Sequence, residues 1–248
     1  MTKCNNIRTL FQREFKAYFD SPVAYVFLIA FLVLTGFLTF AVTMFFEQRQ
    51  ANLSPFFFWH PWVYLLLVPA ATMGTWAEER RSGTIELLLT LPITLAEALV
   101  GKFLAAWAFI AIALGLTFPI VMTTLWLGDP DIGAILCGYV GSLLMAGACV
   151  AIGVFASALS RSQVISFVIS LAVCLGLMII GFDPFINAVS KWGVPAKLVE
   201  AAASCSLIRH FNSMRRGVID LTDVVYYVGV MVFMLAAAHV VTDGRKAS

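Results

Sequence analysis

Hydrophobic residues in this chain gather into long runs that short polar stretches separate. Six of these runs are long enough to cross a bilayer, for which about 20 apolar residues are needed, and they cover Pro22–Phe46, Phe56–Trp76, Lys102–Leu127, Ile132–Ala158, Val164–Gly181 and Thr222–Val241. Lipid offers the backbone no hydrogen-bond partners, so each run should form a helix. The pattern predicts an all-α polytopic membrane protein with six transmembrane helices in a single transmembrane domain, residues 1–248.

The segment before the first run, residues 1–21, is amphipathic. Its apolar side chains recur at helical spacing, at Ile7, Leu10, Phe11, Phe15, Tyr18 and Phe19. The other side carries Arg8, Gln12, Arg13 and Lys16. This pattern predicts an interfacial amphipathic helix whose basic face meets the lipid headgroups of the bilayer. The alternative is an amphipathic helix that packs on protein.

The distribution of Lys and Arg predicts the orientation, because cytoplasmic loops are enriched in both. With the N-terminus inside, the inner side holds Lys3, Arg8, Arg13, Lys16, Arg80, Arg81, Lys102, Arg161, Arg245 and Lys246. The first two outer loops hold only Arg49. Residues 182–221 carry further basic residues on the outer side, but long loops weigh little in this rule. We expect both termini in the cytoplasm, 182–221 as extracytoplasmic helices closing the outer end of a cavity, and 222–248 as sixth span and tail.

One polar stretch, between the second and third runs, is dense in charge. Residues 75–92 contain Glu78, Glu79, Arg80, Arg81 and Glu86, although only 12% of the chain is charged. Such a cluster must lie outside the hydrocarbon or bind protein. Gly83 can end one helix in a left-handed conformation and Thr84 can cap the next. A short cytoplasmic hairpin over residues 77–97 is predicted; the alternative is a solvated loop.

Local signals also predict where helices begin, bend and pack. Thr94-Leu95-Ala96-Glu97 is a capping-box pattern that should start the third span. Pro69 and Pro119 lie inside spans and should kink them. The fourth span carries small residues mostly at four-residue spacing, at Gly138, Ser142, Ala146, Gly153 and Ser157. That stripe favours close helix packing, either within the chain or at a dimer seam.

The chemistry that the sequence lacks narrows its function. Charged residues lie only at span edges, at Lys102 and Asp223, whereas ion-coupled carriers use buried charged groups. HExxH, GxSxG and GxxxxGK[ST] are absent, so neither hydrolysis nor ATP binding is predicted for this chain. The scattered histidines and five cysteines indicate no metal site, and the net charge of +2 gives no reason to expect nucleic acid. We expect no cofactor here, and any energy must come from another protein.

The charged stretch resembles the signature of type-2 ABC transporter permeases. It reads Glu78-Glu79-Arg80-Arg81-Ser82-Gly83-Thr84-Ile85-Glu86-Leu87-Leu88-Leu89-Thr90-Leu91-Pro92, followed by Gly101-Lys102-Phe103. The family pattern is approximately E-E-(K/R)-x-x-G-T-(I/L)-E-x-L-L-(S/T)-x-P, with G-K a few residues later. Further stretches resemble the gliding-motility-associated permeases, namely Ser21-Pro22-Val23-Ala24-Tyr25, Pro61-Trp62-Val63, Gly138-Tyr139-Val140-Gly141 and Arg216-Gly217-Val218-Ile219-Asp220-Leu221.

This resemblance implies a six-helix half-transporter in a bacterial inner membrane. Its hairpin after the second span would be a coupling helix that sits in a groove of a cytoplasmic ABC ATPase, which binds the ATP. The implied ATPase-coupling residues are Glu78, Glu79, Arg80, Arg81, Gly83, Thr84 and Glu86. The N-terminal helix would be a second ATPase contact. A second copy of the chain, or a related permease, would complete the two-fold pathway.

Two functions follow from these expectations. The first is the permease subunit of an ATP-driven exporter, which is not itself an enzyme. The alternative is a mechanotransducing membrane subunit that acts on periplasmic or cell-envelope partners without transport. The hydroxyl residues available to line a route are few, and they would suit an amphipathic substrate: Thr117, Thr123, Thr124, Ser142, Ser166 and Ser170.

Overall fold

Helices make up nearly all of the computed structural model, which describes residues 3–47, 52–84, 93–191 and 195–244 and has no strand in these ranges. In chain order they are α1 (Lys3–Asp20), α2 (Pro22–Phe37), the π-helix η1 (Leu38–Val42), α3 (Ser54–Thr72), α4 (Gly74–Ser82), α6 (Leu95–Gly115), α7 (Phe118–Leu127), α8 (Ile132–Leu159), α9 (Gln163–Ile179), α10 (Asp183–Lys191), α11 (Ala196–Ser204), α12 (Leu207–Arg215) and α13 (Leu221–Gly244). The predicted all-α membrane fold is confirmed.

Five helical stretches of the described chain are long and apolar enough to cross a membrane. They are Pro22–Val42, Ser54–Ser82, Leu95–Leu127, Ile132–Leu159 and Leu221–Gly244. The predicted span at Val164–Gly181 corresponds to α9, which has 17 residues and meets α10 at a bend of 71°. A sixth span therefore depends on α9, alone or with α10.

The helices begin and break where local signals place them. Thr94 caps α6 in a capping box: its hydroxyl accepts from the Glu97 amide at 3.3 Å, and its own amide donates to Glu97 Oε2 at 2.8 Å. The capping box thus starts the helix of the third span, as predicted. This helix begins at Leu95, before the predicted span boundary at Lys102, so Leu95–Glu97 belongs to α6 and not to the hairpin. Interruptions follow Pro69, at Met73, and precede Pro119, at Thr117.

The central helix is α8, which contacts α3, α4, α6, α9, α12 and α13. Its small residues face neighbours of the same chain. A Cβ atom at Gly138 would lie 2.5 Å from the Phe57 ring, and one at Gly153 would lie 2.0 Å from Thr72 Oγ1. Of the two explanations for the stripe, close packing within the chain is the one that the structure supports, because small residues let backbones approach in a bilayer.

Gly153→Ala tests this packing. We expect it to lower the free energy of unfolding by about 1–3 kcal/mol, since the added methyl overpacks the α3–α8 contact. Gly36→Ala is the matched control: nothing lies within 4 Å of a Cβ at Gly36 in α2, so alanine there should be neutral or stabilising. Thermal unfolding of the detergent-solubilised chain measures both. Equal midpoints for the two variants would contradict the tight α3–α8 contact.

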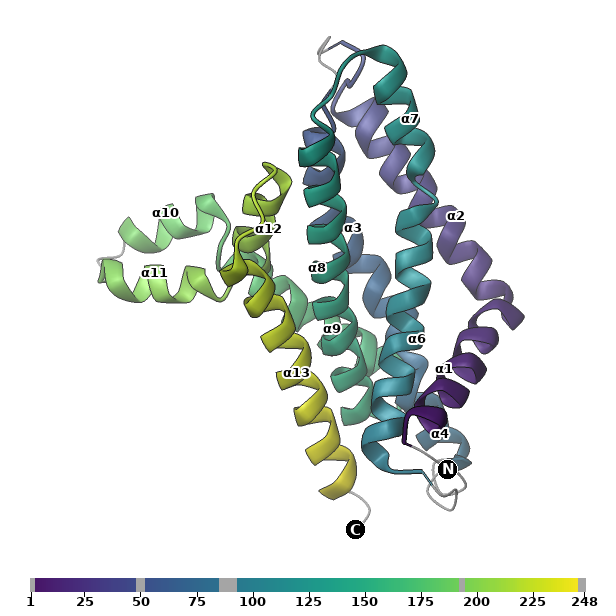
Figure 1. Cartoon of the computed structure of the whole chain (residues 1–248). Coiled ribbons are helices and arrows are strands. Elements are labelled where there is room, and N and C mark those ends of the chain that lie inside the picture. The colour runs from purple at the N-terminus through teal and green to yellow at the C-terminus, as the bar shows by residue number, and fades with distance from the viewer. Residues whose placement is uncertain (1–2, 48–51, 85–92, 192–194, 245–248) are drawn as a thin grey trace.

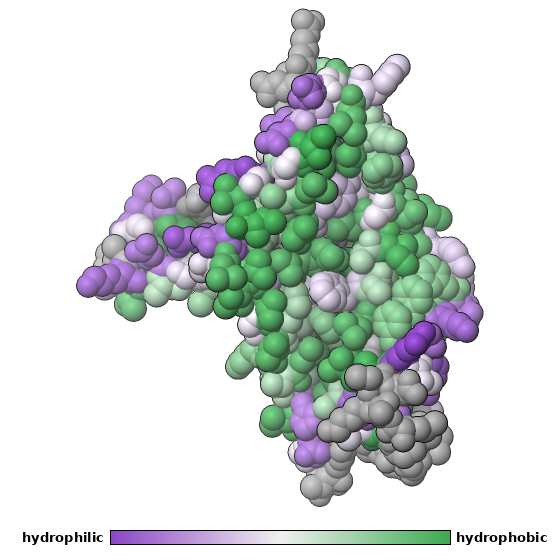
Figure 2. Space-filling view, in the orientation of Figure 1, coloured by the Kyte–Doolittle hydropathy of each residue, from purple (hydrophilic) through white to green (hydrophobic). Residues whose placement is uncertain are grey.

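The spatial arrangement puts α1, α4 and the last turn of α13 at one end of the molecule (Figure 1). The interruption between α7 and α8 lies at the opposite end. The predicted helical segment before the last span is present as α10, α11 and α12. However, α10 and α11 extend sideways from the bundle and do not lie over its upper end, where they were predicted (Figure 1). Figure 2 shows apolar surface over the bundle and hydrophilic residues on this pair.

Candidate functional site

The charged sequence after the second span forms α4 and its C-terminal turn. Gly83 has φ 74°, which confirms the predicted left-handed helix end. The Ser82 hydroxyl bonds to the Glu78 carbonyl at 2.8 Å and to the Thr84 hydroxyl at 2.9 Å, so the turn is closed on itself. The predicted helix that Thr84 would cap, together with the coupling residue Glu86, lies outside the described residues.

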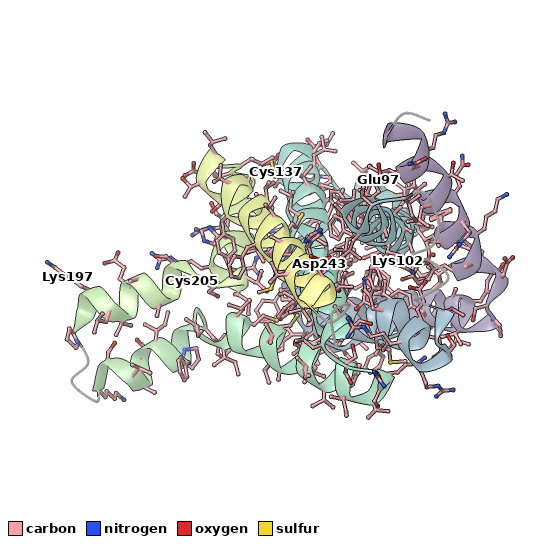
Figure 3. All side chains as sticks on the ribbon, turned by 90° about the horizontal axis from the view of Figure 1, so that it is seen from below. Glu97, Lys102, Cys137, Lys197, Cys205 and Asp243 are labelled. Atoms are coloured by element: carbon pink, nitrogen blue, oxygen red, sulfur yellow. The ribbon has the colours of Figure 1, made fainter. Side chains whose placement is uncertain are left out.

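An ion-pair network fixes α4 to two other helices. Lys102 Nζ on α6 lies 2.7 Å from Glu79 Oε1 on α4 and 3.1 Å from Glu14 Oε2 on α1. Its side chain is only 2% exposed, and the ammonium lies 5.4 Å from the centre of the Trp76 ring. One cation thus faces two carboxylates, away from water. Figure 3 shows Lys102 among the helices, and its side chain is buried there.

The glycine before that lysine brings α1 close to α6. A Cβ at Gly101 would lie 2.9 Å from Leu10 Cδ2. Leu10, Glu14 and Tyr18 follow one another at four-residue spacing, so one face of α1 supplies the contact, the carboxylate and a phenol. The Tyr18 hydroxyl donates to the Ala71 carbonyl at 3.2 Å. Burial raises the pKa of Tyr18, and the negative charge of Glu14 raises it further.

The apolar face of α1 therefore packs on protein. This agrees with the alternative for residues 1–21, a helix packed on protein. Arg8, Arg13 and Lys16 on its other side are exposed, and their contact with lipid headgroups stays a prediction. In the family signature, the pair Gly101-Lys102 then has two separate physical roles. The glycine allows close approach, and the lysine carries the charge network.

A serine from α8 caps the start of α4. The Ser157 hydroxyl accepts from the backbone amides of Trp76 at 2.9 Å and Ala77 at 3.0 Å, and it donates to the Met73 carbonyl at 2.9 Å. These amides belong to the first turn of α4, where no intrahelical partner exists. Ser157 thus does from another helix what an N-cap side chain does locally.

The predicted coupling residues divide into two groups. Glu78 bonds to Gln163 at the start of α9, and Glu79 pairs with Lys102, so both acids hold α4 on the spans. Arg80 is half-buried. Arg81, Gly83 and Thr84 are exposed at the free end of α4. The first group fixes the base of α4, and the second group is available to a partner.

Sequence reasoning did not assign Glu14, Ser157, Gln163 or the pairing of Lys102. Two signals could have found part of this network. Glu14 is an acidic residue on the apolar face of a helix whose polar side is basic, and Lys102 is a lysine inside an apolar helix. A charge in either position requires a partner of opposite sign. Ser157 gives no such signal, because a serine in a stripe of small residues looks like a packing residue.

The sequence also matches a known family over most of its length. The family model described as ABC-2 family transporter protein matches residues 41–242. The chain belongs to the ABC-2 transporter family. A comparison with curated proteins finds no match. As an ABC-2 permease, the protein is a multi-pass membrane component of a transporter, and its family implies association with an ABC ATPase.

The family match includes three parts of the network described above. Glu79, Lys102 and Ser157 lie within residues 41–242, whereas Glu14 and all of α1 precede them. In this ABC-2 permease, the contacts of α4 with α6 and α8 thus lie inside the matched region. The Glu14 carboxylate of α1, which also contacts Lys102, lies before that region.

Proposed function

We propose that this chain is the permease subunit of an ATP-driven exporter and that α4 couples it to a separate cytoplasmic ATPase. One observation carries the proposal: α4 is exposed at its C-terminal end but bonded to three spans at its base. The base contacts reach α6 through Lys102, α8 through Ser157 and α9 through Gln163. A push on the free end of α4 would therefore act on several spans together. ATP would bind to the partner and not to this chain.

The membrane topology that supports this function has six spans, with α9 as the fifth. Its 17 residues would reach about 26 Å at 1.5 Å per residue, close to the hydrocarbon thickness of about 30 Å. Both termini and α4 would face the cytoplasm of a bacterium, in its inner membrane. The location of α1, α4 and the end of α13 at one end supports this orientation (Figure 1).

The remaining partners follow from the same proposal. A second copy of the chain, or a related permease, would complete the transport pathway, because one copy supplies only half of a two-fold structure. The α10–α11 pair extends away from the bundle and is the surface for a periplasmic or cell-envelope partner (Figure 1). Resemblance to gliding-motility-associated permeases supports such a partner.

A specific contact path favours the second function, force transmission without export. From Ser157 at α4, helix α8 runs to Gly141, where a Cβ would lie 2.7 Å from Met214 of α12. Movement of α4 can thus reach the α10–α12 segment through one helix. Reconstitution separates the two functions: an exporter should move a fluorescent lipid analogue across the bilayer on ATP addition. A force transmitter should change the distance between spin labels at Arg81 and Lys197 without lipid transfer.

Charge reversal at Arg81 tests the coupling surface. We expect Arg81→Glu to weaken ATPase binding more than tenfold, since like charges across an interface cost several kcal/mol. Arg81 is exposed, so the unfolding midpoint should not change. Co-purification of the co-expressed ATPase and hydrolysis in membranes measure the effect, with Glu86→Arg as a companion variant. Lys191→Glu, on α10, is the control. Normal ATPase retention by both Arg81→Glu and Glu86→Arg would make the coupling assignment wrong.

A further inference from the structure

A cavity of about 610 Å³ lies between the α10–α11 pair and α12, apart from the coupling site. Arg209, Asn212 and Arg215 of α12 line it together with Arg216, the residue directly after that helix. Ser190 and Glu200 complete the polar lining from the opposite wall. The volume is in the range of small-molecule sites, which runs from about 300 to 1,000 Å³. The cavity is therefore large enough for a ligand.

The charges in this cavity do not balance. Three guanidinium groups face one carboxylate, that of Glu200 on α11. None of the three arginines forms an ion pair with any side chain that the structure describes. The C-terminal end of α12 adds a partial negative charge of only about half a unit. Positive charge is thus in excess, and an anion would neutralise it.

The geometry of α12 directs its polar residues to one side. Arg209, Asn212 and Arg216 follow at spacings of three and four, which places them along one helix face. The helix is fixed from behind. His210 Nδ1 lies 2.6 Å from Asp223 Oδ1 on α13, and the Tyr227 hydroxyl donates to the Leu207 carbonyl at 2.7 Å. The arginine-bearing wall is therefore in place before any ligand binds, which lowers the entropic cost of binding.

Arg215 provides a second observation. Its Nε atom is buried and has no hydrogen-bond partner in the described structure, and its guanidinium lies 5.5 Å from the centre of the Phe58 ring. Burial lowers the pKa of Arg215, and the positive charge of Arg216 lowers it further. A buried donor without an acceptor is unfavourable. An anion at this wall would offset the repulsion between Arg215 and Arg216.

We propose that this cavity binds a phosphate group, and that the group belongs to the headgroup of an anionic phospholipid. Guanidinium groups bind phosphate oxygens in bidentate pairs, which distinguishes arginine from a simple point charge. Apolar side chains, Ile186 and Val199, line the same cavity and suit the glycerol and acyl part of a lipid. The segment adjoins the apolar surface of the bundle (Figure 2). This inference is independent of ATPase coupling, and its test uses no ATPase.

The test measures binding of phosphatidylglycerol to the full-length chain in detergent micelles by thermophoresis. Arg209→Ala with Arg216→Ala should weaken binding by at least about tenfold, because each charge-assisted pair is a strong one. The affinity of the corresponding double Lys variant should lie between those of the unsubstituted chain and the double Ala variant, since lysine keeps the charge but loses the bidentate geometry of the guanidinium. Lys197→Ala is the matched control: this cation lies at the tip of the α10–α11 pair, away from the bundle (Figure 3). It should bind as the unsubstituted chain does.

Two further measurements make the outcome decisive. Diacylglycerol, which lacks phosphate, should not bind at the cavity; binding of both lipids alike, or unchanged binding by the arginine variants, would overturn the proposal. Inorganic phosphate is the second probe. If it competes as well as phosphatidylglycerol does at equal concentration, the lipid assignment is wrong and free phosphate is the ligand. The unfolding midpoint checks that each variant is folded. If the double Ala variant is not folded, the double Lys variant is compared with the unsubstituted chain instead.

Discussion

Lys102→Met is expected to destabilise the protein by about 3 kcal/mol, near the lower end of the range for breaking a buried ion pair. The substitution leaves the Glu79 carboxylate without its cation, next to Glu14, which keeps only its ion pair with the exposed Arg13 at 3.2 Å. The side chains of Glu14 and Glu79 retain 18% and 17% exposure, so water offsets part of the cost. Thermal unfolding should show a lower midpoint, and α1 and α4 should become more accessible to amide hydrogen exchange.

The matched control for this prediction is Lys16→Met. Lys16 lies on the exposed side of α1, so its loss should change the midpoint little. The double variant Lys102→Met with Glu79→Gln should recover part of the stability, because it removes the charge of Glu79, which Lys102→Met leaves unpaired. If Lys102→Met matched the stability of Lys16→Met, the network would not be holding α4 to α6.

Ser157→Ala is the second substitution with a large expected effect. It removes the partner of two backbone amides, at Trp76 and Ala77, and of the Met73 carbonyl. Each buried polar group left unsatisfied costs about 1–3 kcal/mol, and we expect a total of about 2–4 kcal/mol here because the freed helix end can relax. Hydrogen exchange of the α4 amides should accelerate, and ATP hydrolysis by a bound ATPase should respond less to the permease.

A second serine gives the comparison. Ser166 in α9 is also buried, but its hydroxyl has no hydrogen-bond partner in the described structure. Ser166→Ala should therefore be neutral or stabilising, because alanine is close to serine in size and removes the unsatisfied hydroxyl. Equal losses of stability in the two variants would mean that burial alone, and not the capping of α4, explains the effect of Ser157→Ala.

The features that the sequence predicted correctly are those that local physics determines. Apolar runs become helices because lipid leaves the backbone no other partner. Gly83 adopts the left-handed end because it lacks a Cβ atom, and Thr94 with Glu97 starts α6 because the two residues satisfy each other's amides. Each of these depends on neighbours within a few positions of the chain.

The features that the sequence did not predict depend on distant residues. Glu79 and Lys102 are 23 positions apart, and Ser157 reaches amides about 80 positions earlier. The family resemblance implied that all seven coupling residues share one surface, yet the structure pairs Glu78 and Glu79 with side chains of the spans. Which side of a charged helix faces inward is decided by its partners, and no local pattern encodes that choice.

The burial of α8 also decides where two copies of the permease can meet. Its most apolar stretch is 78% buried within one chain, whereas those of α2 and α13 are only 28% and 17% buried. The proposed second subunit would therefore have no access to the stripe of small residues on α8. It would contact peripheral helices such as these two, which lie on opposite flanks of the bundle (Figure 1). A conduit between two copies would then be lined by outer helices, with each α8 serving as a fixed axis behind it.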